Sequence, residues 1–468
     1  MPRQTPALNL NITVLGGGSR YWCQVLMRDL ALCPLIGGHL RLHDLRPPTA
    51  NVAAGERIFA HPDSRSSWTL SATSSLATAL RGTDVVVIGI SPGPAAMFVN
   101  DLEIPQRYGI LQTVGDTTGP GGLSRALRAI PIMSGFAEAI ARYAPQAWVI
   151  NYANPMTLSV AALYAAFPGI RAFGCCHEVY SAQERLAGLV GQHLGVARPD
   201  RHRIAMDIAG VNHFTFATAA RFAGQDLFPV ITRHIAAKGF FADHSAQAQD
   251  LAARGAFWDN HGLIAYDFFR RFGALGAAGD RHLAEFVPWY LNQGEVGLHR
   301  WGVVATPASL RAGTWAAAPG VTPAPSPLAL EENPARLRPS GEEGVAQICA
   351  LHGLGDLDTN VNLPNQGQIA ALPLGAVVET NAQFRHQSCI PIQAAPLPPA
   401  LHSIVARVVD QQQLVLEAGR SRSFDLALQA LLLDPLVSLP TDHSARMLAE
   451  MLRANQALLP GWKIPRRV

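Results

Sequence analysis

Charged residues are scarce in this chain, and their signs nearly cancel. They make up 15% of the 468 residues, with 37 Lys and Arg against 34 Asp and Glu. The net charge is only +3 and there is no long basic run, so a surface for nucleic acid is not expected. Hydrophobic residues reach 49%, which provides for a large core and excludes extensive disorder.

Long apolar runs and cysteines are also few. No stretch approaches the ~20 apolar residues that a membrane span requires. The N-terminus leads directly into a predicted strand, without a basic and then apolar leader. The six cysteines are too dispersed to form a disulfide framework. We therefore expect a cytoplasmic protein without a membrane partner.

Predicted strands and helices alternate over the first 190 residues. Strands are expected at 8–15, 40–45, 83–90, 147–151 and 170–175, and helices at 22–32, 124–143 and 156–166. Such alternation predicts an α/β fold with a Rossmann-like, doubly wound parallel sheet. We place the first domain, which binds a dinucleotide, at residues 8–190.

The pattern changes after residue 190. One antiparallel strand is expected at 208–218, another strand at 374–380, and helices at 245–272, 281–292 and 400–433. Residues 315–339 are rich in Ala and Pro and are expected to form a long loop or lid. Residues 191–468 are therefore predicted to form an α+β domain that completes the site and carries the oligomer contacts.

A glycine-rich turn follows the first predicted strand. Gly16, Gly17, Gly18 and Ser19 come directly before a helix, where bare backbone can approach a pyrophosphate. Asp44 ends the next predicted strand, where its carboxylate would accept a hydrogen bond from a ribose 2′-hydroxyl and favour NAD over NADP. An ordinary strand–helix turn would also fit the glycines alone.

Two further motifs are suited to a polar ligand. The first is Val-Gly-Asp-Thr-Thr-Gly-Pro-Gly-Gly, which contains Asp116 and precedes Arg125 and Arg128. The second places Asn151 and Asn154 at the carboxyl end of a predicted parallel strand, where ligands bind in open sheets. A plain turn and a pair of helix-capping Asn residues are the competing interpretations.

Cys176 and His213 are candidate metal ligands. Cys176 is followed by His177 and Glu178, and His213 follows Asn212. A thiolate and an imidazole are suited to a divalent transition metal with open positions for substrate. From the spacing alone, a buried Cys and a hydrogen-bonded His are the more frequent arrangement.

A third polar group lies further along the chain. Asp267 and Arg270 are i, i+3 neighbours on one predicted helix face. Arg281 and His282 follow in the segment Gly-Asp-Arg-His-Leu-Ala-Glu-Phe. A surface ion pair is the simpler interpretation of Asp267 and Arg270.

Taken in order, these motifs resemble glycoside hydrolase family 4, the NAD- and metal-dependent glycosidases. The resemblance also covers the segments Asn-Pro-Met, Val-Asn-His-Phe, Leu-Pro-Asn-Gln-Gly and Ala-Val-Val-Glu-Thr. It implies that Cys176 and His213 bind a manganese-type ion. The Cys-His-Glu-Val motif looks like that of the α-glucosidase and α-galacturonidase type subgroup, which acts on unphosphorylated α-glycosides.

The resemblance also implies a mechanism that differs from two-carboxylate hydrolysis. NAD⁺ takes a hydride from C3 of the sugar, a base removes the C2 proton, and the C1–O bond is eliminated. Water then adds, and the hydride returns. The site residues expected are Asp267 as base, His177 as acid and Asp116 as a further catalytic group; Asn154, Asn212, Arg270 and Arg281 for substrate; Gly16, Gly18, Ser19, Asp44 and Asn151 for NAD; and Cys176 and His213 for Mn²⁺ or another divalent transition metal.

The sugar is left open by the sequence. An α-glucoside or an α-hexuronide is expected, with α-galacturonide, α-glucuronide and sulfoquinovoside as the acidic alternatives. Arg125, Arg270, Arg281 and His282 are suited to a carboxylate or sulfonate, but equally to structural ion pairs. An NAD-dependent sugar dehydrogenase and a nucleotide-sensing protein are the competing classes. We expect a homodimer or homotetramer.

Overall fold

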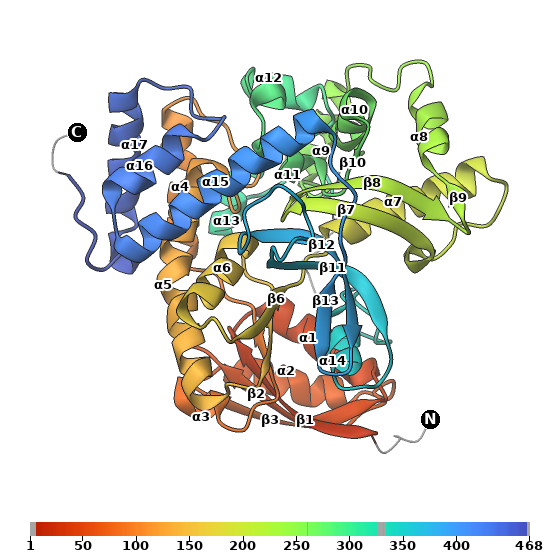
Figure 1. The fold of residues 1–468 in the computed structure, drawn as a ribbon, viewed down its shortest axis with the longest axis vertical. Helices are drawn as coiled ribbons and strands as arrows, with labels where there is room; N and C mark the ends of the chain where they lie inside the picture. The colour runs from red at the N-terminus through yellow and green to blue at the C-terminus, as the bar shows by residue number, and fades with distance from the viewer. Residues whose placement is uncertain (1–5, 260, 318, 325–330, 332–333, 466–468) are drawn as a thin grey trace.

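A single sheet extends through both halves of the chain. The structure is a computed structural model that describes residues 6–259, 261–317, 319–324, 331 and 334–465. Thirteen strands of these residues pair into one sheet, which runs from the red N-terminal strands to the yellow-green strands at its other end (Figure 1). Backbone hydrogen bonds therefore join the two halves directly.

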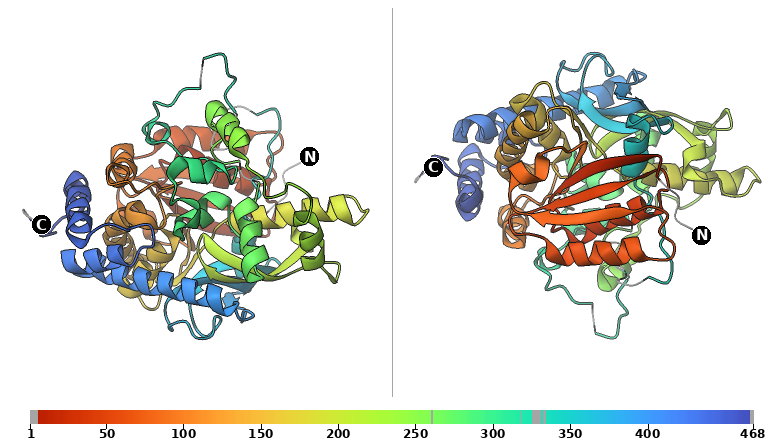
Figure 2. Two further views of the ribbon diagram at one scale, coloured as in Figure 1. Left: turned by 90° about the horizontal axis from the view of Figure 1, so that it is seen from above. Right: turned by 90° about the horizontal axis from the view of Figure 1, so that it is seen from below.

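The first six strands are parallel and have the predicted Rossmann-like arrangement. Their order is β3-β2-β1-β4-β5-β6, and the red and orange strands among them lie side by side when seen from below (Figure 2). The strands are β1 (Leu8–Leu15), β2 (Ile36–His43), β3 (Trp68–Thr73), β4 (Val85–Ile88), β5 (Trp148–Asn151) and β6 (Arg171–Gly174). The helices are α1 (Arg20–Leu32), α2 (Thr49–Ala60), α3 (Leu76–Leu80), α4 (Ala95–Arg107), α5 (Gly119–Tyr143), α6 (Met156–Ala166) and α7 (Glu178–His193).

The remaining strands continue the sheet in antiparallel fashion. The order from β6 is β11-β12-β7-β8-β10, with β13 on β12 and β9 on β8. The strands are β7 (Ile204–Val211), β8 (Phe214–Phe222), β9 (Gln225–Asp226), β10 (Leu275–Gly276), β11 (Leu357–Pro364), β12 (Val377–Arg385) and β13 (Ser388–Pro391).

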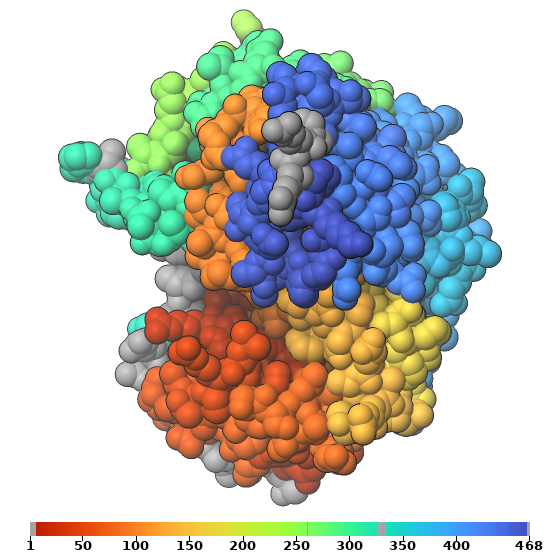
Figure 3. Space-filling model, turned by 90° about the vertical axis from the view of Figure 1, so that its left-hand side faces the viewer, coloured from red at the N-terminus to blue at the C-terminus, as the bar shows by residue number. Residues whose placement is uncertain are grey.

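Helices pack around this second part. The blue residues, which include α15, α16 and α17, occupy the centre and right of the upper part of one face, with orange residues to their left and green residues above them (Figure 3). The helices are η1 (Arg201–Arg203), α8 (Phe228–Ile235), α9 (Ser245–Arg254), α10 (Leu263–Phe272), α11 (Asp280–Glu285), η2 (Pro288–Tyr290), α12 (Gly294–His299), α13 (Ala308–Ala312), α14 (Gly344–Leu351), α15 (Pro399–Ser421), α16 (Phe424–Leu432), α17 (Thr441–Ala454) and η3 (Gln456–Leu458).

Alternation along the buried strands divides the core between the two faces of the sheet. On β4, Val86 and Ile88 belong to the cluster under α5, whereas Val85 and Val87 belong to the cluster under α1 and α14. A strand that is buried on both faces needs such a continuous Val/Ile run. This is why the sequence identifies β4 and β5 readily.

Three expectations about the second half are wrong. Residues 281–292 are not one helix, because α11 ends at Glu285 and only the short η2, which begins at Pro288, follows. Residues 208–218 are not one strand, because β7 ends at Val211 and β8 begins at Phe214, so that Asn212 and His213 form a hairpin turn. Residues 245–272 are not one helix, because Gly255 ends α9 and Gly262 precedes α10, both in the left-handed region with φ of 70° and 73°.

Three other expectations concern the layout of the chain. The proposed boundary between residues 190 and 191 falls within α7, and the two-domain division stays a prediction. The described part of 315–339 contains no helix or strand, in line with the predicted loop. The six cysteines are free, and within the described ranges we find no helix that is both long enough and apolar enough to traverse a bilayer.

A buried ion pair links α4 to α5. Asp101 and Arg128 are both 0% exposed, and Arg128 Nη1 donates to Asp101 Oδ1 at 3.0 Å. We expect Asp101→Asn to lower the free energy of unfolding by about 3–5 kcal/mol, because a buried guanidinium would lose its counter-charge. Denaturant unfolding measures the loss.

The matched control for this prediction is Asp442→Asn. Asp442 pairs with Arg446 at 3.0 Å on the surface of α17, and its side chain is 64% exposed. We expect a change below about 1 kcal/mol there. Equal losses in the two variants would contradict a structural role for the buried pair.

Candidate functional site

The glycine-rich turn lies where the strand order reverses. β1 pairs with β2 on one side and β4 on the other, so its carboxyl end is the switch point at which open sheets bind ligands. Gly16 has φ +94°, and a Cβ added there would lie 2.6 Å from the carbonyl oxygen of Gly89. Only glycine fits this close approach of two backbone segments.

The same turn is fitted to a dinucleotide. Gly18 N–H donates to Asp44 Oδ2 at 2.8 Å, and a Cβ on Gly18 would lie 2.6 Å from that oxygen. Ser19 caps α1 by accepting from Trp22 N–H at 3.2 Å. The turn therefore offers a bare backbone, a helix N-terminus and a carboxylate at the end of β2, as NAD binding requires.

Asn151 has a different role in this structure. Its amide donates to Ala153 O at 3.0 Å and accepts from Ala153 N–H at 3.2 Å, and the residue is 0% exposed. The side chain closes the turn after β5. Contact between Asn151 and NAD stays a prediction.

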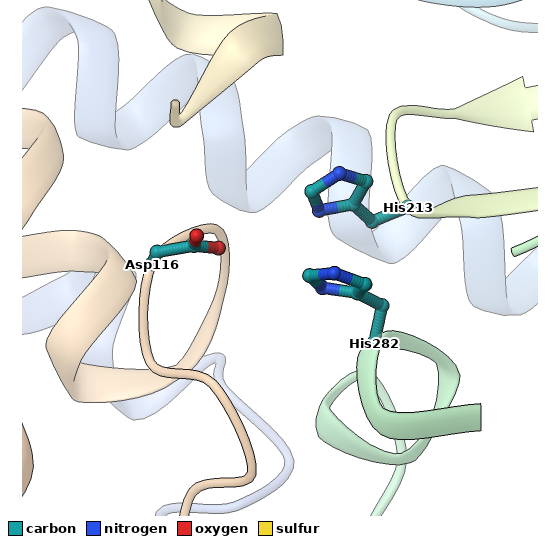
Figure 4. A group of neighbouring side chains, drawn as sticks. All are labelled: Asp116, His213 and His282. Carbon is teal, nitrogen blue, oxygen red and sulfur yellow. The ribbon is translucent and has the colours of Figure 1, made fainter. Parts of the chain in front are cut away.

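Three side chains from separate elements converge on one point. Asp116 comes from the loop before α5, His213 from the β7–β8 turn and His282 from α11 (Figure 4). One ligand atom from each residue lies within 4.8 Å of the others. His213 has φ +66°, a strained conformation for a non-glycine residue that is typical of functional positions. The set of one carboxylate and two imidazoles fits a divalent transition metal.

The protonation states also suit a cation. Burial and repulsion by His282 lower the pKa of His213 to about 3, so the imidazole is neutral at physiological pH. Burial opposes ionisation of Asp116, but attraction by His282, His213 and Arg125 outweighs it and lowers the pKa of this carboxyl. Thr117 Oγ1 lies 2.9 Å from His213 Nδ1 and orients the ring.

Cys176 is close to this cluster but outside it. Burial raises the pKa of its thiol well above the usual range, and the charges of Glu379 and Glu178 raise it further. The group of mutually close ligand atoms includes His213 but not Cys176. Metal binding by Cys176 therefore stays a prediction, whereas Asp116 and His282 join His213 as candidate ligands.

His177 and Glu178 connect the cluster to the glycine turn. The ring of His177 stacks on Trp22 at 5.9 Å between centroids, and Glu178 Oε1 lies 3.6 Å from His282 Nε2. His177 Nδ1 lies 3.0 Å from Glu342 Oε1. Partial loss of water around the ring opposes protonation, but the hydrogen bond and charge of Glu342 raise the pKa of His177 to about 9. A protonated imidazole at this position fits the predicted acid.

Asp267 and Arg270 lie in a different environment. Asp267 pairs with Arg270 at 2.5 Å and Arg271 at 2.8 Å, and it accepts from Tyr290 at 3.1 Å. No ion pair or hydrogen bond among the described residues joins it to Asp116, His213 or His282. The structure therefore shows an ion pair between Asp267 and Arg270, which was the simpler interpretation of the sequence. It gives no support to Asp267 as base or to Arg270 as a substrate ligand.

The remaining predicted substrate residues do gather near the cluster. Asn154 Oδ1 is buried without a hydrogen-bond partner, and Arg125 Nε donates to Asn154 O at 3.1 Å. Asn212 lies beside Cys176. Arg281, which is on α11, is close enough to Glu178 and Asp116 for their charges to act on it. The sequence did not identify Arg311 or Glu342, because neither belongs to a recognisable motif.

Loss of His213 tests the metal cluster. We expect His213→Ala to weaken Mn²⁺ binding by about 100-fold or more, since it removes a neutral nitrogen ligand. Calorimetric titration of the protein with Mn²⁺ measures the affinity. His193→Ala, on α7, is the control and is expected to bind normally.

Two further variants separate the candidate ligands. If His282→Gln also weakens Mn²⁺ binding, the cluster in Figure 4 is supported; loss in Cys176→Ser would add the thiol to the ligand set. Unchanged Mn²⁺ binding in His213→Ala would contradict the metal site, whether His213 shares it with Asp116 and His282 or with Cys176.

Asp44 should set the cofactor preference. We expect Asp44→Asn to weaken NAD⁺ about 10-fold and to reduce discrimination against NADP⁺, because the amide can still accept from Gly18 but no longer repels a 2′-phosphate. Fluorescence titration with both nucleotides measures this. Equal affinity of the unmutated protein for NAD⁺ and NADP⁺ would argue against this role.

Solved structures with the same fold include glycosidases. A Bacillus subtilis protein assigned as a glucosidase superposes with a TM-score of 0.82 at 38% identity, covering 95% of this chain and 100% of its own. The 6-phospho-beta-glucosidase of Thermotoga maritima, solved with manganese, NAD⁺ and glucose-6-phosphate, gives a TM-score of 0.71 at 19% identity over 96% of this chain and 99% of its own. The predicted α/β fold is confirmed.

Sequence relatives give a consistent picture. An alpha-galacturonidase of Thermoanaerobacterium saccharolyticum is 40% identical over 97% of this chain and 98% of its own length. An alpha-glucosidase of Erwinia rhapontici is 28% identical over 90% of this chain and 93% of its own length. The expected NAD and divalent-metal dependence agrees with the family that these matches indicate.

The models of two family regions cover most of the chain. The region described as family 4 glycosyl hydrolase matches residues 11–192, and the family 4 C-terminal domain matches residues 208–437. The resemblance drawn from the motifs is thereby confirmed, and with it the prediction of an enzyme that hydrolyses glycosides. The chain belongs to glycoside hydrolase family 4.

Proposed function

We propose that this enzyme is an NAD- and divalent-metal-dependent α-glycosidase that acts on α-galacturonides. The observation that carries the proposal is the convergence of Asp116, His213 and His282, linked through Glu178 and His177 to the glycine turn. The relatives named alpha-galacturonidase are more similar to this chain than those named alpha-glucosidase or alpha-galactosidase, which supports the hexuronide over a neutral sugar.

The cofactors supply reactivity that the side chains lack. When bound, NAD⁺ would supply a hydride acceptor and donor, and a divalent ion would supply a Lewis acid for a sugar oxygen. The backbone of Gly16–Ser19 and the carboxylate of Asp44 would hold the nucleotide. Asp116, His213 and His282 would hold the ion, and Cys176 remains the additional ligand implied by the family resemblance.

The chain's own groups handle the leaving oxygen. His177 is protonated at neutral pH because it is hydrogen-bonded to Glu342, and we assign it to protonate the departing oxygen. The exposed fraction of its side chain, 47%, leaves the ring accessible. Asp267 is not part of this proposal, since its carboxylate is committed to Arg270, Arg271 and Tyr290.

Product analysis in D₂O tests the reaction. With NAD⁺, Mn²⁺ and an aryl α-galacturonide, we expect aryl alcohol release over many turnovers without net NADH. Deuterium should appear at C2 of the released sugar, because the C2 proton is removed and then replaced from solvent. Mass spectrometry and NMR of the product measure the incorporation.

The controls separate the proposed glycosidase from a dehydrogenase and from a conventional hydrolase, and they report which sugar is preferred. An aryl α-glucoside and an aryl α-galactoside with the same leaving group report the sugar preference, and added chelator should stop the reaction. Net NADH would indicate a dehydrogenase. A product without deuterium at C2 would mean conventional hydrolysis and would contradict the mechanism.

A further inference from the structure

Three arginines border the Asp116 side of the cluster. Arg125 lies on α5, Arg281 on α11 and Arg311 on α13. The guanidinium groups of Arg125 and Arg311 both lie over the ring of Phe98, at 4.7 and 4.4 Å from its centroid. Arg281 donates to Thr306 Oγ1, two residues before α13 begins. The three side chains therefore lie in one neighbourhood, next to Asp116.

These arginines make no close ion pair, unlike other buried arginines of the protein, although the charges of Asp116 and Glu285 act on them from further away. Arg128 pairs with Asp101, and Arg201 pairs with Glu343 at 2.9 Å. No ion pair to Arg125, Arg281 or Arg311 occurs among the described residues. The contrast separates these three residues from arginines that serve only to support the fold.

Two of the three also have unused donors. The Nε atoms of Arg281 and Arg311 are buried and have no hydrogen-bond partner. Arg125 differs, because its Nε donates to Asn154 O and its Nη2 to Ser91 Oγ at 3.2 Å. Arg281 and Arg311 are therefore free to bind a ligand, while Arg125 adds positive charge from a fixed position.

The three guanidinium groups carry like charges. Arginine stays protonated in proteins, so Arg125, Arg281 and Arg311 place permanent positive charges beside Asp116. The carboxylates that act on these arginines already have other partners. Asp116 belongs to the histidine cluster. Glu178 lies 3.6 Å from His282 and accepts from Gly279 N–H at 2.6 Å, and Glu285 accepts from the N–H groups of Val114 and Gly115 at 2.7 and 2.8 Å. Buried like charges of this kind are costly without an anion between them.

We propose that Arg281 and Arg311 bind the C6 carboxylate of the sugar and so select a hexuronide over the matching neutral hexose. Guanidinium groups recognise a carboxylate through paired N–H donors. The proposal rests on the proposed function, because it takes the sugar ring to lie at the Asp116–His213–His282 cluster. It adds the residues that decide the substrate, and Arg311 stands outside every motif of the sequence.

The test compares two substrates that differ only at C6. The holoenzyme, with NAD⁺ and Mn²⁺, is assayed with an aryl α-galacturonide and the aryl α-galactoside of the same leaving group. We expect Arg311→Met to lower kcat/KM about 100-fold for the galacturonide, since it removes a charge-assisted hydrogen bond. The value for the galactoside should change less than about 3-fold. Arg311→Lys should restore part of the preference.

Several controls exclude a merely structural effect. Arg254→Met, an arginine on α9 that pairs with Asp250 at 2.8 Å, should retain the ratio of the two substrates. Inhibition of the unmutated holoenzyme by free galacturonate should exceed inhibition by galactose, and this comparison holds even if Arg311→Met fails to fold. NAD⁺ affinity should be the same in Arg311→Met and the unmutated protein.

The outcomes distinguish the two proposals. An unmutated enzyme that cleaves neither substrate would contradict the proposed function. Cleavage of the galacturonide with an unchanged substrate ratio in Arg311→Met, or an equal loss on both substrates, would overturn only the carboxylate assignment. Loss of NAD⁺ binding in Arg311→Met would assign the arginines to the cofactor phosphates and would also overturn it.

Discussion

The site depends on one close contact between two strands of opposite direction. β6 is the last parallel strand, and it pairs with β11 at Gly174 and Asn362. A Cβ on Gly174 would lie 3.0 Å from Cβ of Asn362 and 2.8 Å from Met156, so the joint requires a glycine. The chain then leads directly from this joint into Cys176, His177 and Glu178.

Polar contacts behind that joint keep the site residues in place. Asn362 and Asn360 both donate to Glu379 on β12, and Asn360 also donates to Cys176 O at 3.1 Å. The next strand, β7, leads into the hairpin turn that carries His213. A nucleotide turn on β1 and a histidine from an antiparallel hairpin can face one site because the sheet is continuous between them.

The sequence predicted the parts of the fold that have a strong local signal. β1, β4, β5 and α6 are found where the apolar patterns placed them. The hairpin at Asn212 was missed because it interrupts an apolar run with only two residues, although an Asn in a short turn is itself a signal. The break between α9 and α10 was missed because the flanking segments have similar helical periodicity, and Gly255 and Gly262 were the clues to it.

The candidate site was predicted less completely than the fold. The glycine turn, Asp116, His213 and Arg281 were identified from motifs, and the structure brings them near one another. Arg311 could not be identified from the sequence, because it lies on a helix of only five residues beside an irregular segment. Asp267 was chosen by family analogy, and spacing could not show that Arg271 and Tyr290 would occupy its carboxylate.

The separate halves of the site are coupled through charge. Arg125 and Arg311 are the permanent cations that act on Asp116, and they oppose the arrival of another positive charge at the neighbouring histidines. A sugar carboxylate bound to Arg281 and Arg311 would offset that repulsion. A divalent ion at the cluster would in turn favour binding of the sugar carboxylate. Such coupling is reciprocal, because each ligand changes the affinity for the other by the same factor. Under the proposed function, the metal ion and the acidic sugar would therefore bind together better than either one alone.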